Sequence, residues 1–474
     1  MKKPLVVDLD GTLLRSDILV ESALGYVRCG VVYAISILFW IFRGKALLKE
    51  ELANRVPLRV DVLPYNHKVL GFLEEQKKHR PIVLATATHQ LYADQIGEHL
   101  GLFDRIIATG NGQNVSAHTK RDLLVETYGE KGFDYIGNSM ADVPVWKSAE
   151  NAYVADPEPG VLKKAHQQGN VEMVFRTRSN IWSALVRALR PHQWLKNLLI
   201  GIPLLASHQF TNTGAILSAL LAFVLFSLIA SSGYLINDLL DLDSDRHHER
   251  KRHRPLASGD LPLVTGIAAI PLLVLVAFVL SFLFLPAGFS VSLGLYFLLS
   301  VSYSQYLKRI AVVDTIILAC LYTLRIIAGA FACGLVPTFW ILAFSMFLFL
   351  SLAMVKRYAE LLDSRAKGEH AKTKGRGYFS DDLEIVANLG TAAGYLSVLV
   401  LALYIQDERT VSMYAVPELI WLACPILLFW ISRIWMITHR GTMHDDPVLF
   451  AVKDRVSLLS GGLFALVFIL AVFV

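Results

Sequence analysis

A charged stretch of the sequence, residues 237–259 (NDLLDLDSDRHHERKRHRPLASG), lies between two long apolar runs. Three of its aspartates are spaced i, i+3 and i+7, which places them on roughly one face of a helix. Carboxylates that share a face repel one another unless a hard cation lies among them. Mg²⁺ held by one or two carboxylates and by the phosphates of a substrate is the usual arrangement. The expected metal-binding residues are Asn237, Asp238, Asp241 and Asp245, of which Asp238 and Asp241 are the expected catalytic pair.

A basic cluster follows these carboxylates at once: Arg246, Arg250, Lys251, Arg252 and Arg254. An acidic metal site beside a basic cluster suits a diphosphate, and we expect Arg252 and Arg254 to bind its phosphates. The alternative is a solvated loop at a membrane surface, whose basic residues only fix the topology. The joint pattern of Asn-Asp, two further aspartates in register and Arg-Pro-Leu-Ala-Ser-Gly is more specific than charge alone and favours the diphosphate site.

A second set of residues suited to chemistry lies near the N-terminus. The segment PLVVDLDGTLL (4–14) predicts a buried strand that runs into Asp8 and Asp10. These side chains would lie at the carboxyl edge of a parallel sheet, where open α/β folds bind ligands. Further buried strands are predicted within 81–90 and 133–149, with helical patterns between them. Strands that alternate with helices predict a parallel, doubly wound α/β domain.

This domain resembles the haloacid dehalogenase-like phosphatase superfamily. DLDGTL matches the DxDGT signature, Thr86 the second motif, Lys120 the third and GNSMAD the acidic fourth. The resemblance implies that Asp8 is the nucleophile that takes a phosphoryl group and that Asp10 is the general acid and base. It further implies that Thr86 and Lys120 hold the phosphoryl oxygens. The metal-binding residues implied for Mg²⁺ are Asp8, Asp10, Asn138 and Asp142.

One position departs from the pattern of that superfamily, because Asn138 stands where the fourth motif usually has an aspartate. A neutral amide can still bind a cation through its carbonyl oxygen, but the site then has one negative charge fewer. The sequence leaves two possibilities open: an active phosphatase, and an inactive or docking domain.

Residues 17–80 are expected to form a helical cap over this site. The segment GVVYAISILFWIF (30–42) is very apolar, yet its thirteen residues fall short of the roughly 20 needed to span a bilayer. It forms either the core of the cap or a face that rests on the membrane or on the second domain. Trp40 and Phe42, followed by Arg43, suit an interface and favour the second possibility.

The composition indicates a membrane protein. Of the 474 residues, 54% are hydrophobic and 18% are charged, and the mean hydropathy is +0.48, which is too apolar for a soluble chain of this length. The net charge of +5 gathers in particular loops, which favours membrane topology and phosphate ligands over nucleic acid.

The expected domains are 1–175 for the phosphatase-like part, 176–190 for a linker and 191–474 for an all-α membrane part. Nine apolar segments predict nine transmembrane helices: 193–208, 213–236, 261–285, 287–305, 310–334, 337–355, 384–406, 413–437 and 456–474.

The basic residues predict which loops face the cytoplasm. With the N-terminus inside, the inner loops are 237–260, 306–309, 356–383 and 438–455. These loops hold nearly all the basic residues of the membrane part, among them Lys367, Lys372 and Lys374, whereas the outer loops hold only Arg409. This positive-inside bias predicts a multi-pass protein of the cell (inner) membrane with a cytoplasmic N-terminal domain and a C-terminus outside.

The membrane part, from about residue 190 to 474, resembles the UbiA-type intramembrane prenyltransferase superfamily. The first aspartate-rich motif of that superfamily is NDxxDxxxD, followed by a basic stretch and RPxxSG, and residues 237–259 match it closely. The resemblance implies membrane helices around a central cavity, Mg²⁺ that bridges a diphosphate, and a polyprenyl tail along an opening to the lipid.

The second half of the membrane part departs from most of that superfamily. Its loop, KRYAELLDSRAKGEHAKTKGRGYF (356–379), lacks the usual second motif DxxxD and is rich in cations. Phosphate is therefore expected to be held partly by side-chain charge rather than by a second metal. Arg325 lies inside an apolar run, where it is either a functional residue or a structural partner of an aspartate such as Asp314. The expected phosphate-binding residues are Lys196, Asn197, Tyr303, Lys308, Arg325, Lys356, Arg357 and Glu360.

Together with RPHQWLKN (190–197), this basic loop resembles the branch that includes decaprenyl-phosphate phosphoribosyltransferases. The resemblance implies transfer from phosphoribosyl pyrophosphate to a polyprenyl phosphate in the membrane. The fused domain would then remove the 5-phosphate from the lipid-linked product, a phosphorylated small-molecule group. The first rival is an aromatic prenyltransferase with a prenyl diphosphate donor, which the missing DxxxD disfavours. The second is a transporter or scaffold, which the odd helix number and the lack of a visible inverted repeat disfavour; DLDGT in place of DKTGT excludes a P-type pump.

Overall fold

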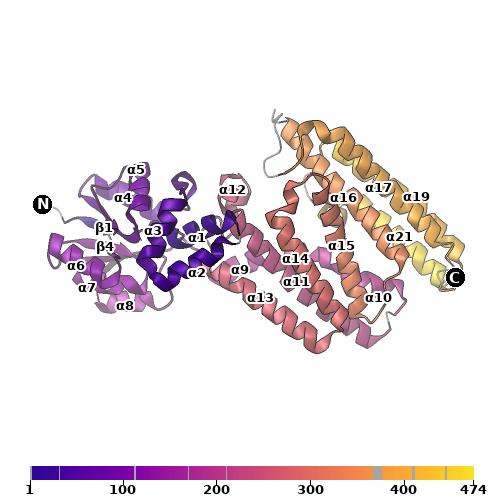
Figure 1. Cartoon of the computed structure of the whole chain (residues 1–474), viewed down its shortest axis with the longest axis horizontal. Coiled ribbons are helices and arrows are strands. Elements are labelled where there is room, and N and C mark those ends of the chain that lie inside the picture. Colours follow the sequence, from indigo (N-terminus) through magenta and orange to yellow (C-terminus); the bar gives the residue numbers. More distant parts are fainter. Residues whose placement is uncertain are drawn as a thin grey trace. The chain divides into compact units, whose positions relative to one another are not determined.

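A computed structural model gives the structure of the chain, and it describes residues 3–30, 32–110, 114–168, 170–209, 211–366, 376–407, 412–443 and 446–473. These residues form two compact units (Figure 1). Unit 1 comprises 1–189 and 238–269, and unit 2 comprises 190–237 and 270–474. The basic residues Lys367, Lys372, Lys374 and Arg409, which contribute to the predicted charge bias, lie outside the described residues.

The N-terminal part of unit 1 contains a six-stranded sheet in the order β3-β2-β1-β4-β5-β6. All paired strands are parallel, and the chain enters at the centre of the sheet, because β1 pairs with both β2 and β4. This confirms the predicted doubly wound domain. The strands are β1 (Leu5–Val7), β2 (Ile82–His89), β3 (Arg105–Thr109), β4 (Asp134–Gly137), β5 (Asn151–Ala155) and β6 (Asn170–Phe175).

Helices cover both faces of this sheet, as the alternation of side chains along β1 requires. Leu5 and Val7 pack on one face with residues of α4 (His67–Lys77) and α5 (Gln90–Leu100). Val6 faces the other side, where it packs with residues of three helices: α6 (Ala117–Tyr128), α7 (Val143–Ser148) and α8 (Val161–Gln168). The strand is therefore buried on both sides, which explains its continuous apolar sequence.

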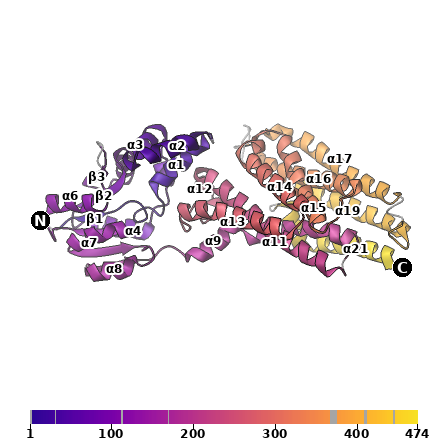
Figure 2. The same ribbon diagram turned by 60° about the horizontal axis from the view of Figure 1, so that its bottom comes forward.

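Three helices of the segment predicted as a cap pack on one another: α1 (Ile18–Arg28), α2 (Tyr33–Arg43) and α3 (Lys45–Arg55) (Figure 2), whereas α4 of the same segment packs on the sheet. Trp40 is buried against Leu48 and Leu52 of α3, so this part of the apolar segment is cap core and not an interface. The opposite side of α2 is exposed, with Phe42 at 89% and Ile35 at 67% of their full accessibility. Whether a membrane or another surface covers this side stays a prediction.

The segment 238–269 belongs to unit 1. It contains α12 (Leu242–His247) and the short η4 (Lys251–His253). Gly259 has a φ of +74°, and a Cβ at this position would lie 2.6 Å from Cβ of Arg15. The glycine of the RPxxSG motif is therefore required both by its backbone conformation and by its close approach to the turn after β1.

Eight helices of the described residues are long and apolar enough to cross a membrane. Among them, α15 is the most buried and α13 the least. Neighbours from α14 to α17, then α19 and α21, pack in chain order. The eight spans, in part with a preceding 3₁₀ turn, are Thr213–Leu240 (α11), Leu263–Phe284 (α13), Ala287–Gln305 (α14), Val313–Ala332 (α15), Phe339–Ala366 (α16), Ser380–Tyr404 (α17), Pro417–His439 (α19) and Arg455–Phe473 (α21).

The remaining predicted span, 193–208, is not one continuous helix. It folds as a 3₁₀ segment, η3 (Pro191–Gly201), followed by the short α10 (Ile202–Ala206). Gly201 and Pro203 stand at this junction, and proline cannot donate the backbone hydrogen bond that continues a helix. The described residues thus give eight long spans and one interrupted segment where the sequence predicts nine helices. Shorter helices complete the fold: α9 (Ile181–Leu189), α20 (Pro447–Lys453), η1 (Val60–Val62), η2 (Met140–Asp142), η5 (Leu307–Arg309), η6 (Ser380–Asp382) and η7 (Pro417–Leu422).

Candidate functional site

The predicted phosphatase residues meet at the carboxyl edge of the sheet in unit 1. Asp8 follows β1 directly, and Gly11 makes the turn with a φ of +73°. A Cβ on Gly11 would lie 2.3 Å from Nδ2 of Asn138, so only glycine lets the first and fourth motifs approach this closely. The sheet thereby brings together motifs that are more than a hundred residues apart in the chain.

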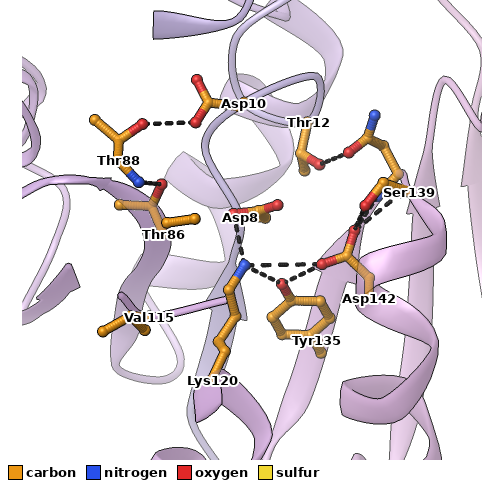
Figure 3. Close-up of polar contacts among 12 residues, drawn as sticks. Asp8, Asp10, Thr12, Thr86, Thr88, Val115, Lys120, Tyr135, Ser139 and Asp142 are labelled. Carbon is orange, nitrogen blue, oxygen red and sulfur yellow. Dashed lines mark hydrogen bonds and ion pairs between the residues drawn. The ribbon is translucent and has the colours of Figure 1, made fainter. Parts of the chain in front are cut away.

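A buried network joins Asp8 to Asp142 (Figure 3). Nζ of Lys120 donates to Oδ1 of Asp8 at 2.8 Å and to the hydroxyl of Tyr135 at 3.0 Å. That hydroxyl in turn donates to Oδ1 of Asp142 at 2.7 Å. Lys120 is 4% exposed, so its ammonium needs both carboxylates as counter-ions; it lies 3.8 Å from Asp142. Tyr135 was not expected from the sequence, in which it is one more apolar residue of a strand.

The fourth motif is held by its own hydrogen bonds. Oδ2 of Asp142 accepts from the backbone N–H of Asn138 at 3.0 Å and from the N–H and hydroxyl of Ser139 at 2.9 and 3.0 Å. Oδ1 of Asn138 accepts from the hydroxyl of Thr12 at 3.2 Å. Asp142 therefore shapes this turn and balances Lys120, whereas the amide of Asn138 lies beside the DxDGT turn.

Asp10 lies on the other side of Asp8. Its Oδ2 accepts from the hydroxyl of Thr88 at 2.6 Å and its Oδ1 from the backbone N–H of Ile18 at 2.8 Å. The hydroxyl of Thr86 accepts from the N–H of Thr88 at 3.0 Å, and both threonines belong to β2. Thr88 was missed, although its position two residues after Thr86 places it on the same face of the strand.

Burial sets the protonation of this site. It raises the pKa of Asp8 to about 6, against the opposing effect of Lys120. It also raises the pKa of Asp10 to about 7, with a further contribution from the charge of Asp17. For Lys120, burial opposes the charge, but Asp8 and Asp142 outweigh it, and the pKa is raised. A carboxyl group that titrates near neutrality is suited to act as both acid and base.

The acidic stretch also lies in unit 1 from Asp238 onward. Arg254 bridges two of the predicted aspartates, donating to Asp238 at 3.1 Å and to Asp245 at 2.5 Å. The helix is interrupted between them, because α11 ends at Leu240 and Asp241 caps α12. Asp238 and Asp245 thus converge, although not on one uninterrupted helix as the spacing predicts. Oδ1 of Asp245 is buried and accepts no hydrogen bond from the residues that the structure describes, and burial raises the pKa of this carboxyl group.

The basic residues of this stretch have different environments. Arg246 forms a two-pronged contact with Glu21 of α1, at 2.6 and 3.1 Å, and both side chains are 4% exposed. Its Nε donates to the carbonyl of Ala257 at 3.0 Å. Arg246 is therefore committed to a protein carboxylate, which the sequence did not indicate. Arg252 is exposed.

In unit 2, two predicted phosphate-binding lysines converge on a residue that was not predicted. Nζ of Lys196 lies 2.8 Å and Nζ of Lys356 3.4 Å from Oδ2 of Asp446. Burial would raise the pKa of Asp446, but Lys356 and Lys196 outweigh it and hold the pKa below its usual value. The signal in the sequence was an aspartate before Pro447, between two apolar runs.

A second ion pair lies deeper in unit 2. Arg357 is 2.9 Å from Asp314, and both side chains are almost fully buried. Arg357 also contacts Glu360, which lies 3.8 Å from Arg376. Arg376 donates to the hydroxyl of Tyr303 at 3.0 Å. The predicted residues Arg357, Glu360 and Tyr303 thus belong to one network. Lys308 lies in the turn η5.

Arg325 does not pair with Asp314, so the predicted structural alternative is wrong in that detail. Its Nε donates to Oδ1 of Asn197 at 2.9 Å and its NH2 to the hydroxyl of Tyr296 at 2.9 Å. The rings of Phe226, Tyr296 and Tyr322 lie 4.8–5.5 Å from the guanidinium carbon. A cation among three rings and an amide is stabilised without a carboxylate. Asn237, the last residue of unit 2 in the acidic stretch, is half-buried.

At both candidate sites, the protein offers few side-chain ligands for Mg²⁺. Within the described ranges, no three His, Cys, Asp or Glu side chains lie close enough to hold a metal together. Mg²⁺ commonly uses one or two carboxylates and completes its shell with water and substrate phosphates. Asp238 and Asp245 meet that requirement, and within the described residues Oδ1 of Asp245 accepts no hydrogen bond, with Nζ of Lys251 3.9 Å away. Asp8 with the amide of Asn138 supplies one carboxylate and one neutral oxygen.

The family model for the UbiA prenyltransferase family matches residues 198–451, which is more than half of the chain. The chain belongs to the UbiA prenyltransferase family. With the eight long apolar helices found among its described residues, this family member is a multi-pass membrane protein. The predicted resemblance of the membrane part is confirmed.

Relatives of this UbiA family member differ in how much of it they cover. The y4nM protein of Sinorhizobium fredii is 34% identical over 99% of this chain and 91% of its own length, so the likeness extends through both domains. A decaprenyl-phosphate phosphoribosyltransferase of Mycolicibacterium smegmatis is 32% identical over 62% of this chain and 94% of its own length. A solved phosphoserine phosphatase in its apo form is 16% identical over 38% of this chain and 96% of its own, with a TM-score of 0.27. The haloacid dehalogenase-like character of the N-terminal domain rests on its sheet order and on the contact between motif residues such as Lys120 and Asp8.

Proposed function

We propose that the membrane part transfers a phosphoribosyl group from phosphoribosyl pyrophosphate to a polyprenyl phosphate, and that the N-terminal domain removes the 5-phosphate of the product. The basic residues of the membrane part carry this proposal. Lys196 and Lys356 meet at Asp446, and the loop that follows Lys356 lacks the DxxxD of aromatic prenyltransferases. The name of the Mycolicibacterium relative, whose match covers nearly its whole length, supports the same acceptor class and the same transferred group.

In the transfer step, an oxygen of the lipid phosphate attacks the anomeric carbon of the ribose. The bond from that carbon to the pyrophosphate oxygen breaks, and pyrophosphate leaves with the bonding electrons. Mg²⁺ held by Asp238 and Asp245 would supply positive charge to the leaving group. Arg254 already lies between these carboxylates and adds a fixed cation there.

Lys196 and Lys356 of unit 2 would bind a phosphate group of the substrate. Lys196 and Lys356 share the single carboxylate of Asp446, so two positive charges face one negative charge. An incoming phosphate would supply the missing charge. Arg325 orients Asn197, whose amide nitrogen also donates to Ser227 at 2.9 Å, so this residue is fixed on both sides.

In the phosphatase step, a carboxylate oxygen of Asp8 would attack the 5-phosphate and form an aspartyl-phosphate, while the sugar 5-oxygen leaves with a proton from Asp10. Asp10 then takes a proton from the water that hydrolyses the intermediate. Lys120 and Thr86 would hold the phosphoryl oxygens. Mg²⁺ at Asp8 and Asn138 would supply further charge neutralisation.

A labelled-donor experiment tests the transfer. Membranes that contain the full-length protein are incubated with polyprenyl phosphate and either ribose-labelled phosphoribosyl pyrophosphate or labelled prenyl diphosphate with an aromatic acceptor. We expect label from the first donor alone to enter the lipid fraction. Label only from prenyl diphosphate would overturn the proposal in favour of an aromatic prenyltransferase.

Asn138→Asp is expected to change how the protein responds to Mg²⁺. Asn138 is 5% exposed and lies beside the DxDGT turn, so an added carboxylate without a cation should cost about 1–3 kcal/mol of stability. Mg²⁺ should stabilise the variant more than the wild type, because it then balances one more charge. The measurement is the thermal unfolding midpoint of the full-length protein with Mg²⁺ and with a chelator. Asn170→Asp, at an exposed position of β6, is the control; equal Mg²⁺ shifts in all three proteins would contradict the expectation.

A further inference from the structure

The phosphatase residues open into a cavity of about 1120 Å³ in unit 1. That volume exceeds the roughly 300–1,000 Å³ of sites that take an ordinary small molecule. Asp8, Asp10 and Lys120 line one part of it. Its lining also includes Arg178, Asp260 and the residues 262–264 at the start of α13. The cavity is therefore larger than the attack on one phosphate requires.

Arg178 is placed at this cavity by the sheet. It follows β6, at the same carboxyl edge at which Asp8 follows β1. Asp156, just after β5, holds the segment: its carboxylate accepts from the N–H of Thr177 at 2.6 Å and from the N–H of Arg178 at 3.0 Å. The backbone that carries Arg178 is thereby fixed before any ligand binds.

Arg178 belongs to the lining of the cavity, and its side chain is only partly exposed. Its Nε is buried and, within the part of the chain that the structure describes, has no hydrogen-bond partner. Burial lowers its pKa, although the charge of Asp156 opposes this. Arg15 and Arg187, by contrast, both bind Asp260, at 2.5 and 3.0 Å. The charges of Asp156, Glu158 and Asp260 compensate the desolvation of Arg178 only in part, and an anionic ligand would add to this compensation.

The lining near Arg178 also contains the start of a membrane helix. Leu263 begins α13, one of the helices long and apolar enough to cross a bilayer, and Val264 is 58% exposed. Both residues belong to the same unit as the phosphatase sheet. A substrate in this cavity thus meets both a phosphoryl-transfer site and the first apolar residues of a span.

We propose that Arg178 binds a second phosphate of the phosphatase substrate: the phosphodiester that joins a phosphorylated sugar to a lipid. This inference rests on the proposed function and specifies its substrate class as a lipid-linked sugar with two phosphate groups. Only the terminal phosphomonoester is hydrolysed: its P–O bond breaks, and the phosphodiester stays intact on Arg178. Arginine suits this role because its fork of donors matches two oxygens of a phosphate.

The test compares two substrates with the full-length protein in lipid nanodiscs. The first is ribose 5-phosphate, which has one phosphate. The second is a short-chain prenyl phosphoribose 5-phosphate, which has the phosphodiester as well. We expect the wild type to prefer the second at least tenfold in kcat/KM. Arg178→Gln should reduce kcat/KM for the second at least tenfold more than for the first, through KM, and Arg178→Lys should restore part of the loss.

Arg105→Gln, at an exposed position of β3, is the matched control and should leave the preference as in the wild type. Equal losses on both substrates in Arg178→Gln, or no loss on either, would overturn the proposal.

A binding measurement separates this inference from the proposed activity. Asp8→Asn protein is titrated calorimetrically with the prenyl phosphoribose 5-phosphate, with and without Arg178→Gln. A Kd at least tenfold weaker in the double variant supports the role of Arg178 even if the wild type releases no phosphate, which would refute the phosphatase step alone. An unchanged Kd refutes the role of Arg178 even if phosphate is released.

Discussion

Asp8→Asn in the full-length protein is expected to slow phosphate release by at least about 10³-fold, because an amide cannot replace the carboxylate as nucleophile. The substitution keeps the shape of the side chain. Lys120 keeps its hydrogen bond to Tyr135 and its ion pair with Asp142, so the domain should still fold. The measurement uses phosphoribosyl pyrophosphate labelled in its 5-phosphate. Wild-type protein should return that label as inorganic phosphate, whereas Asp8→Asn should leave it in the lipid.

Asp122→Asn is a matched control for this experiment. Asp122 lies on α6, outside the lining of the cavity, with a side chain that is 62% exposed. It should release phosphate at the wild-type rate. If Asp8→Asn also released phosphate at that rate, the N-terminal domain would not be a phosphatase of this mechanism, and the docking alternative would stand.

Asp238→Asn is expected to lower the transfer rate by about 10²-fold or more, the size of loss that follows when a fixed electrostatic contact to a transition state is removed. Asp238 is 2% exposed and bound to Arg254, which also binds Asp245. With an amide at 238, Arg254 keeps one carboxylate, but the cation site loses half of its charge. The measurement is the rate at which ribose label enters the lipid as Mg²⁺ is varied.

Asp243→Asn is a close control, because Asp243 lies on the same stretch but pairs with Arg28 of the cap. It should transfer at nearly the wild-type rate. Hydrolysis of ribose 5-phosphate in the same preparations reports whether each variant is folded. If Asp238→Asn transferred the ribose label as fast as Asp243→Asn, the acidic stretch would be a structural element neutralised by Arg254. It would then not bind the leaving group.

The phosphatase-like domain was largely predictable from the sequence. Its central strands β1, β2 and β4 are almost fully buried, and site residues lie at or just after their carboxyl ends, as Asp8 does. The place of each such residue at the edge of the sheet follows from the strand that it ends. Tyr135 and Thr88 could not be predicted as site residues, because their roles arise from which neighbours the folded strands bring to them and not from a motif.

The acidic stretch was predictable in composition but not in geometry. The spacing of Asp238, Asp241 and Asp245 predicts one helix, but the helix is interrupted at Asp241. Arg254, expected to meet a phosphate, already bridges two of the carboxylates. Ion pairs between distant segments, such as Lys196 with Asp446, leave no periodic signal in a sequence, since charge alone does not show which partner lies near.

The pair of Arg246 with Glu21 has a practical consequence for anyone who divides this chain. A fragment that begins at residue 190 would keep Arg246 but lose Glu21. Removing the carboxylate of a buried ion pair destabilises the folded protein by about 3–5 kcal/mol. Gly259, pressed against Arg15, would lose its neighbour in the same cut. Expression of either domain as a separate fragment is therefore a poor route to its activity, and inactivating point substitutions in the intact polypeptide are the better way to separate the two proposed reactions.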